Sequence, residues 1–163
     1  MNHSVDTQTL SGLLKGRVCV LGVGNRERSD DGCGSILAER LSETLGKWSI
    51  DAGMVPENYL EKAVRLNPDS VLIIDAVDFD GVPGEACFLT PEDIATAGIS
   101  THALSLGMAA EYLSARTNAR LAILAIQPVN LDHGTGLSEK ISRSVLNLYE
   151  LLLSFFNETR SHS

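Results

Sequence analysis

Hydrophobic residues along the chain fall into short continuous runs that alternate with longer segments of helical periodicity. The apolar runs at residues 17–23, 70–76 and 120–126 predict buried parallel strands, because a strand covered on both faces lacks polar alternation. A shorter run at residues 48–51 predicts a further strand. Residues 85–89 follow a segment dense in turn formers and are expected to fold back as an antiparallel edge strand.

Helices are predicted between these strands. Leucines recur at helical spacing within residues 31–45, and Pro56 suits the first turn of a helix over residues 56–66. Further helices are expected as a single turn after a Thr90 cap, over residues 102–116, and as a long segment after Ser138. This order predicts a three-layer, doubly wound α/β fold, with a mostly parallel five-stranded sheet and an antiparallel edge strand.

Length and composition indicate one ordered domain. At 163 residues, with 44% hydrophobic and 21% charged residues, the chain resembles an average globular domain. We therefore expect a single α/β domain over residues 1–163, in which residues 1–15 are an extension of uncertain order. The first ten or so residues and residues 158–163 are expected to be poorly ordered.

Charge and cysteine content narrow the possible partners and location. The formal net charge of −8 argues against nucleic acid as a partner, because phosphate binding requires clustered Lys and Arg. No apolar stretch is long enough to span a bilayer, so no membrane partner is expected. The three cysteines lack CxxC spacing, which is typical of a reducing compartment, and no secretory signal is recognisable. These features predict a cytoplasmic location.

The loop after the first strand is a poor match to a dinucleotide-binding loop. Glu27 stands where the third glycine of that motif is required. The loop also presents Asp30 and Asp31 at a helix N-terminus, where they would repel a pyrophosphate. The simplest interpretation of Asp30 is a helix cap, which leaves Asp31 without an obvious structural role.

Two further polar residues lie near the ends of predicted strands or the starts of helices. Asp75 ends an apolar strand, where a buried carboxylate needs a partner or a cation, although bonding to loop amides would also explain it. His102 lies at a helix start, where packing or solvation is the commoner role. In a parallel sheet Asp31, Asp75 and His102 could converge on one crevice. Two carboxylates and one imidazole would suit a divalent metal such as nickel or zinc.

Other candidate nucleophiles are weaker. The chain lacks the G-x-S-x-G elbow of serine hydrolases. Cys33 lies in a first helical turn, but neighbouring carboxylates would raise its pKa, so a small buried residue is the better interpretation. Cys19 is expected in the core. His133 could be a second site histidine, although a solvated loop residue is favoured.

Several short strings follow one another along the chain. They are Leu21-Gly22-Val23-Gly24-Asn25, Asp30-Asp31-Gly32-Cys33-Gly34, Ile73-Ile74-Asp75-Ala76-Val77-Asp78, Pro83-Gly84-Glu85, Ser100-Thr101-His102 and Ile126-Gln127-Pro128. In this order and spacing they resemble the hydrogenase maturation proteases, which trim the C-terminus of [NiFe]-hydrogenase large subunits. The resemblance covers roughly residues 18–153 and is nearest the branch that serves the formate-hydrogenlyase hydrogenase.

The resemblance implies an aspartyl-type, metal-dependent endopeptidase whose substrate is a nickel-loaded large-subunit precursor with a C-terminal extension. The family's metal-contacting positions correspond to Asp31, Asp75 and His102, which are both the catalytic and the metal candidates. The nickel would be borne by the substrate and held weakly by the isolated protein. Whether the ion is the electrophile or only a recognition handle stays open at this point.

Two other functions are compatible with the same residues. A non-enzymatic metal-binding checkpoint, or an inactive homologue, would carry the same three residues on the same fold. A nucleotide-binding regulator of flavodoxin-like shape would be stabilised thermally by nucleotides, which we do not expect.

Overall fold

The strands form one mixed sheet that agrees with the predicted order. The computed structural model describes residues 4–97 and 103–161. The five strands are β1 (Val18–Val23), β2 (Ser49–Gly53), β3 (Ser70–Ala76), β4 (Ala86–Leu89) and β5 (Arg120–Ile126), arranged as β2-β1-β3-β5-β4. All pairings are parallel except β4 with β5, so the antiparallel edge strand is confirmed.

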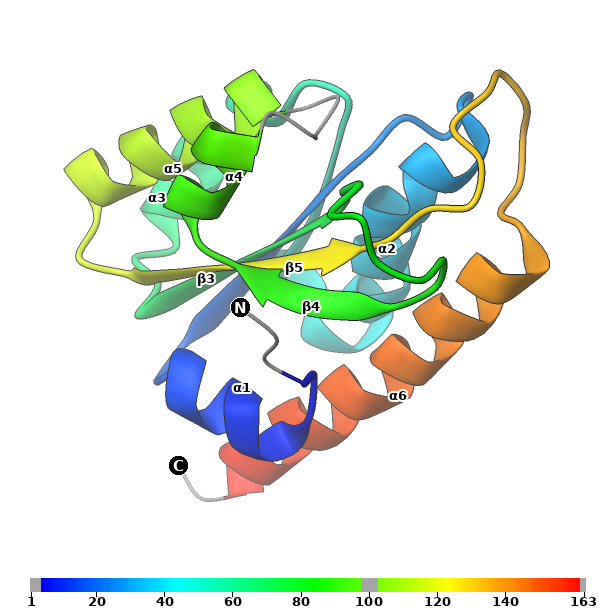
Figure 1. Cartoon of the computed structure of the whole chain (residues 1–163). Helices are drawn as coiled ribbons and strands as arrows, with labels where there is room; N and C mark the ends of the chain where they lie inside the picture. The colour runs from blue at the N-terminus through cyan, green and yellow to red at the C-terminus, as the bar shows by residue number, and fades with distance from the viewer. Residues whose placement is uncertain (1–3, 98–102, 162–163) are drawn as a thin grey trace.

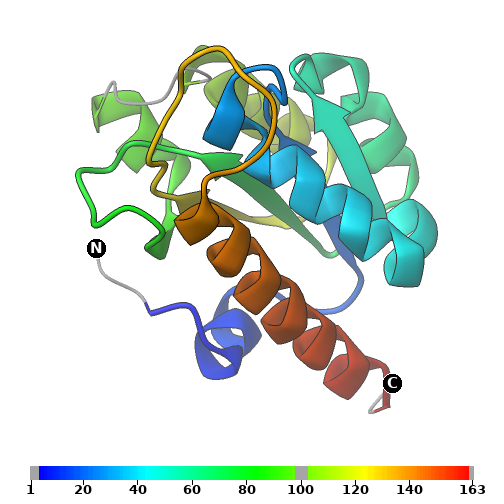
Figure 2. The same ribbon diagram turned by 90° about the vertical axis from the view of Figure 1, so that its right-hand side faces the viewer.

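Helices cover both faces of this sheet (Figures 1 and 2). One face is covered by α1 (Thr7–Leu13), α2 (Cys33–Leu45) and α6 (Glu139–Ser161). The other is covered by α3 (Leu60–Arg65), α4 (Pro91–Ala97) and α5 (Ala103–Arg116). The three-layer α/β fold is therefore confirmed.

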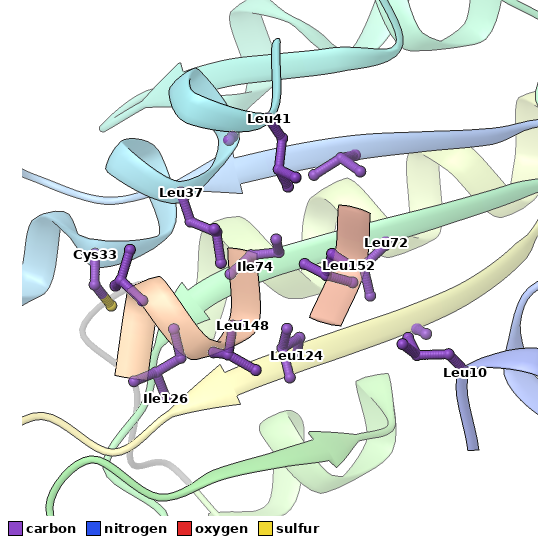
Figure 3. Close-up of a cluster of buried hydrophobic side chains, with 14 of the residues drawn as sticks. Leu10, Cys33, Leu37, Leu41, Leu72, Ile74, Leu124, Ile126, Leu148 and Leu152 are labelled. Carbon is purple, nitrogen blue, oxygen red and sulfur yellow. The ribbon is translucent and has the colours of Figure 1, made fainter. Parts of the chain in front are cut away.

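The two cores follow from the alternation of side chains along the strands. In β3, Leu72 and Ile74 pack on the α2–α6 side, whereas Val71 and Ile73 pack on the α3–α5 side. Every residue of this central strand is buried, which explains its continuous apolar sequence. Figure 3 shows the first core, where α2 and α6 contribute leucines against the side chains of β3 and β5.

The ends of the chain are more regular than expected. The segment predicted to be poorly ordered contains α1, which is capped by Asp6 and buries Leu10 against the first core. The apolar spacing of this short helix was missed because only Leu10 and the following Leu14 are buried. At the other end α6 continues to Ser161, beyond the predicted start of the tail at residue 158.

Several helix starts differ in detail. Asp31 lies in a 3-10 helix, η1 (Ser29–Gly32), and the α-helix begins only at Cys33. The predicted helix over residues 56–66 is divided into η3 (Pro56–Asn58) and α3. The Thr90 cap is confirmed by a reciprocal pair of bonds with Asp93, although α4 extends over seven residues rather than one turn.

Two strand connections define where ligands are expected. From β1 the chain crosses to β2 on one side, whereas β3 lies on the other side of β1. In doubly wound sheets this reversal opens a crevice at the carboxyl ends of the two strands.

No helix among the described residues is long and apolar enough to cross a membrane.

Candidate functional site

Glycines bring α2 unusually close to the carboxyl ends of β1 and β3. A Cβ atom on Gly34 would lie less than 3.0 Å from the carbonyl oxygens of Ile74 and Val23. A Cβ on Gly22 would likewise lie less than 3.0 Å from the carbonyl oxygen of Gly34. These contacts leave no space for a side chain. The start of α2, and the η1 turn before it, therefore lie directly against the two strand ends.

The η1 turn places Asp31 near the carboxyl ends of β1 and β3. Its side chain is 1% exposed, and Oδ2 accepts a hydrogen bond from the backbone N–H of Asn25 at 3.2 Å. A Cβ on Gly24 would clash with the carbonyl oxygen of Asp31, so a glycine is also required there. The β1–α2 loop thus folds back over Asp31 and fixes its position.

Asp75 is the last residue but one of β3, the strand next to β1. It is fully buried, and Oδ1 accepts a hydrogen bond from the backbone N–H of Ala76 at 2.8 Å. Ala76 is itself part of β3, so this donor is a strand amide rather than one of the loop amides that were considered as partners.

Cys33, at the start of α2, lies near both carboxylates, and η1 contacts β3. Burial first, and then the charges of Asp75, Asp30 and Asp31, raise the pKa of the Cys33 thiol well above its ordinary value. A charge affects a pKa in this way only at short range. The structure therefore brings Asp31 and Asp75 into one buried acidic region at the switch point of the sheet.

His102 lies outside the described residues. Its sequence position directly precedes α5, which begins at Ala103. Among residues 4–97 and 103–161, no group of three His, Cys, Asp or Glu side chains could hold a metal ion. The predicted three-residue site is therefore represented here by its two carboxylates, and its third member stays a prediction.

Asp30 has a different role from the helix cap that was expected. Its fully buried carboxylate accepts hydrogen bonds from the backbone N–H groups of Val129, Asn130 and Ser138 at 3.0, 3.0 and 2.7 Å. The Ser138 hydroxyl donates a fourth bond, at 2.9 Å. Asp30 therefore joins the β1–α2 loop to the β5–α6 loop, and the simple capping interpretation is wrong.

Backbone bonds extend this junction between the two loops. The N–H of Ser29 donates to the carbonyl oxygen of Gly134, and the N–H of Gly134 donates to that of Glu27, each at 2.9 Å. The Arg28 Nε donates to the carbonyl oxygen of Leu131 at 3.2 Å. His133 lies in this loop with its side chain exposed, as expected for a solvated residue.

Gln127 joins a third loop to the same end of the sheet. Its Oε1 accepts hydrogen bonds from the backbone N–H groups of Phe79 and Gly81 at 2.9 and 3.0 Å, and its Nε2 donates to Asp78 at 3.0 Å. The side chain is nearly fully buried. It therefore holds the β3–β4 loop against the end of β5, a role that its sequence position did not reveal.

The exposed arginine of the β1–α2 loop is also engaged. Arg26 donates through Nε to the Ser35 hydroxyl at 3.0 Å and through Nη2 to Asp51 at 2.8 Å, and it forms an ion pair with Glu39. Ser35 in turn donates to Asp51 at 2.5 Å. This network connects the loop to α2 and β2, so its positive charge is balanced locally.

A cavity of about 430 Å³ lies at the opposite end of the sheet. Its lining includes Arg17, Trp48, Asp69 and Phe156, and Arg17 already forms an ion pair with Asp69 at 3.4 Å. It lies at the amino ends of the strands, away from Asp31 and Asp75. The chemistry of the buried carboxylates, rather than the size of a cavity, identifies the candidate site.

Comparison with known proteins agrees with this architecture. A family model described as HycI, hydrogenase maturation protease, matches residues 36–155. The hydrogenase 3 maturation protease of Escherichia coli is 33% identical over 136 residues, which are 82% of this chain and 86% of that protein. The chain belongs to the hydrogenase maturation protease family.

Two further proteins extend the comparison. The crystal structure of a [NiFe] hydrogenase maturation protease HycI from Thermococcus kodakarensis superposes with a TM-score of 0.81 at 30% identity, over 93% of this chain and 97% of that one. A putative hydrogenase maturation protease of Methanocaldococcus jannaschii is 28% identical over 88% of this chain and 90% of its own length. The protein is thus a peptidase with a HycI-like fold.

The cysteines of this protease are poorly suited to be its nucleophile. All three are free and buried. Burial raises the pKa of Cys19 to about 12 and that of Cys87 to about 11, and Cys33 is further affected by the adjacent carboxylates. The thiolate is the reactive form, so a cysteine-peptidase mechanism is disfavoured.

The Asp30 junction should contribute strongly to stability. We expect Asp30→Ala to lower the free energy of unfolding of the protease by roughly 2–4 kcal/mol, because three backbone amides and the Ser138 hydroxyl lose a fully buried carboxylate acceptor. Asp69→Ala is the matched control, since Asp69 also joins distant segments but is 41% exposed at the other end of the sheet. Unfolding in urea measures the free energy of unfolding of the two variants. An equal decrease in both would contradict a special role for the buried junction.

The thiols of the native protease should be unreactive. At pH 8 we expect a disulfide reagent to titrate none of the three cysteines in the folded protein and all three in urea. Because folding raises these pKa values above the ordinary 9.0, the folded state retains thiol protons that the unfolded state loses. Their effect on stability therefore appears as a loss when the pH rises above about 9. Rapid native labelling of Cys33 would contradict this assignment.

Proposed function

We propose that this protease removes the C-terminal extension of a nickel-loaded [NiFe]-hydrogenase large-subunit precursor. Asp31, Asp75 and His102 would contact the nickel that the precursor carries. The observation that carries the proposal is the convergence of Asp31 and Asp75, both buried, at the carboxyl ends of adjacent strands. Family membership supplies the peptidase activity and the kind of substrate.

The charge of the site favours a cation in the substrate. Peptide hydrolysis develops negative charge on the carbonyl oxygen, which a purely acidic site would destabilise. In the described part of the β1–α2 loop, Arg26 and Arg28 are the cationic side chains, and both are engaged with other groups. A divalent ion carried by the precursor would supply the missing positive charge and activate the attacking water.

The ligand set also explains why the ion would belong to the substrate. Two carboxylates and one imidazole leave coordination positions open and provide no thiolate that would hold nickel firmly. The isolated protease would therefore bind divalent metals weakly. The cysteines of the precursor would hold the ion, and the three protease residues would add to its coordination sphere. All three cysteines of the protease are free, which supports our proposal of a cytoplasmic location.

The proposal predicts that the acidic residues are needed for cleavage and that nickel is recognised. Asp31→Asn, Asp75→Asn and His102→Gln should each abolish removal of the extension from nickel-loaded precursor, measured by intact mass. Asp69→Asn, at the far end of the sheet, should cleave like the wild type. Metal-stripped wild-type protease should cleave nickel-loaded precursor and leave iron-only precursor intact.

Three outcomes would change the proposal. Equal cleavage of both precursors would remove nickel recognition but retain the peptidase. Cleavage by the folded Asp31→Asn protein would remove Asp31 from the site. Binding of loaded precursor without any cleavage by the wild type would favour the alternative of a non-enzymatic checkpoint.

A further inference from the structure

Four exposed hydrophobic side chains lie on the loops that follow the carboxyl ends of the parallel strands. Met54 and Val55, after β2, are 55% and 41% exposed. Val82, after β3, is 67% exposed, and Val129, after β5, is 50% exposed. Exposing apolar surface is unfavourable, so several such residues at one end of a sheet indicate an interaction surface.

The strand order places these residues on both sides of the acidic pair. Asp31 follows β1, and Asp75 is the last residue but one of β3; these are the two inner strands of the series β2-β1-β3-β5. Met54 and Val55 follow β2 on one side, and Val129 follows β5 on the other. Val82 belongs to the loop that Gln127 holds against the end of β5. We call Met54 and Val55 the β2 flank, and Val82 and Val129 the β5 flank.

Hydrogen bonds fix the backbone that carries both flanks. On the β2 side, the N–H of Gly24 donates to the carbonyl oxygen of Gly53 at 2.9 Å. On the β5 side, the N–H of Val129 donates to the carboxylate of Asp30 at 3.0 Å. The loops after β1 and β5 lie together at this end of the molecule (Figure 2). Both flanks are therefore preformed, which reduces the entropic cost of binding.

The distance between the flanks suits a short extended peptide. Neighbouring strands lie about 4.8 Å apart, so β2 and β5, separated by three spacings, are about 14 Å apart. An extended chain advances about 3.3 Å per residue, so four or five residues cross this distance. A peptide bond near the middle of such a segment would lie over Asp31 and Asp75.

The charges around the flanks restrict the peptide further. Glu27, Asp78, Asp80 and Asp132 are exposed on the loops after β1, β3 and β5. Arg26, the exposed arginine among them, is ion-paired with Asp51 and Glu39. An acidic peptide would therefore be repelled, and a segment with apolar and neutral or basic side chains would be accepted.

We propose that the β2 flank and the β5 flank bind an extended segment of the precursor on the two sides of the bond that is cleaved. This inference rests on the proposed function and adds a docking surface for the peptide, separate from the residues assigned to nickel. The occupant is the precursor chain itself, from about two residues before the bond to about two residues after it.

The test uses two double variants of the full chain and a matched control. Met54→Ser/Val55→Ser changes the β2 flank, and Val82→Ser/Val129→Ser changes the β5 flank. Met108→Ser/Leu146→Ser removes hydrophobic side chains of similar exposure, 58% and 49%, from α5 and α6. With nickel-loaded precursor we expect each flank variant to raise KM about tenfold with kcat within about twofold, and the control to match the wild type.

A shortened precursor assigns each flank to one side of the bond. When the extension is cut to a single residue, the second residue beyond the bond, which would reach the flank on that side, is lost. One flank variant should then have the same KM as the wild type, whereas the other should keep its tenfold increase. Loss of both effects, or of neither, would overturn a peptide bound across the site.

Other outcomes separate this inference from the proposed function. Wild-type KM in both flank variants, with normal cleavage, would overturn the docking surface and leave the proposed function intact. If the wild type binds loaded precursor but does not cleave it, the proposed function fails, and the flank variants are then compared by Kd with the same tenfold expectation. A concentration-dependent dimer of the wild type that both flank variants abolish in sedimentation would identify the surface as a self-interface and overturn the proposal.

Discussion

The close approach of α2 to the ends of β1 and β3 is the constraint on which the site depends. A Cβ atom on Gly22 or Gly34 would lie less than 3.0 Å from backbone atoms, so neither position has space for a side chain. A side chain at either position would move the helix away from the sheet, and Asp31 would move with it. Asp75 is fixed by the central strand, so the position of the helix decides how near Asp31 lies to it.

The adjacent residues Asp30 and Asp31 show how one short turn supports two roles. Asp30 faces the β5–α6 loop, and its burial is compensated by four hydrogen bonds. Asp31 faces the strand ends, where its carboxylate accepts a hydrogen bond from the backbone N–H of Asn25. Asp30 therefore fixes the turn from the side of the β5–α6 loop, and the position of Asp31 depends on that turn. The loop that carries Val129 is fixed by the same side chain.

Local patterns were sufficient for the fold but not for the contacts between loops. The runs that form β3 and β5 were predicted to the residue, since buried parallel strands have an unbroken apolar sequence. The burial of Asp75 followed from its position near the end of an apolar strand. The roles of Asp30 and Gln127 could not be predicted, because their partners lie about 100 and about 50 residues away and their sequence neighbours give no sign of them. The helix α1 was missed because it buries too few residues to produce a periodic signal.

The structure suggests how binding and recognition would be divided in this protease. Apolar side chains on preformed loops gain free energy from any suitable peptide, whether or not a metal is present. Two buried carboxylates contribute favourable binding free energy only when a cation lies beside them. Without a cation, they destabilise the negative charge that develops on the carbonyl oxygen during hydrolysis. Under the proposed function, a precursor without nickel would still dock but would meet a site that opposes the reaction. Selectivity for the loaded precursor would then appear mainly in kcat, because the ion changes the transition state more than it changes the docking of the chain.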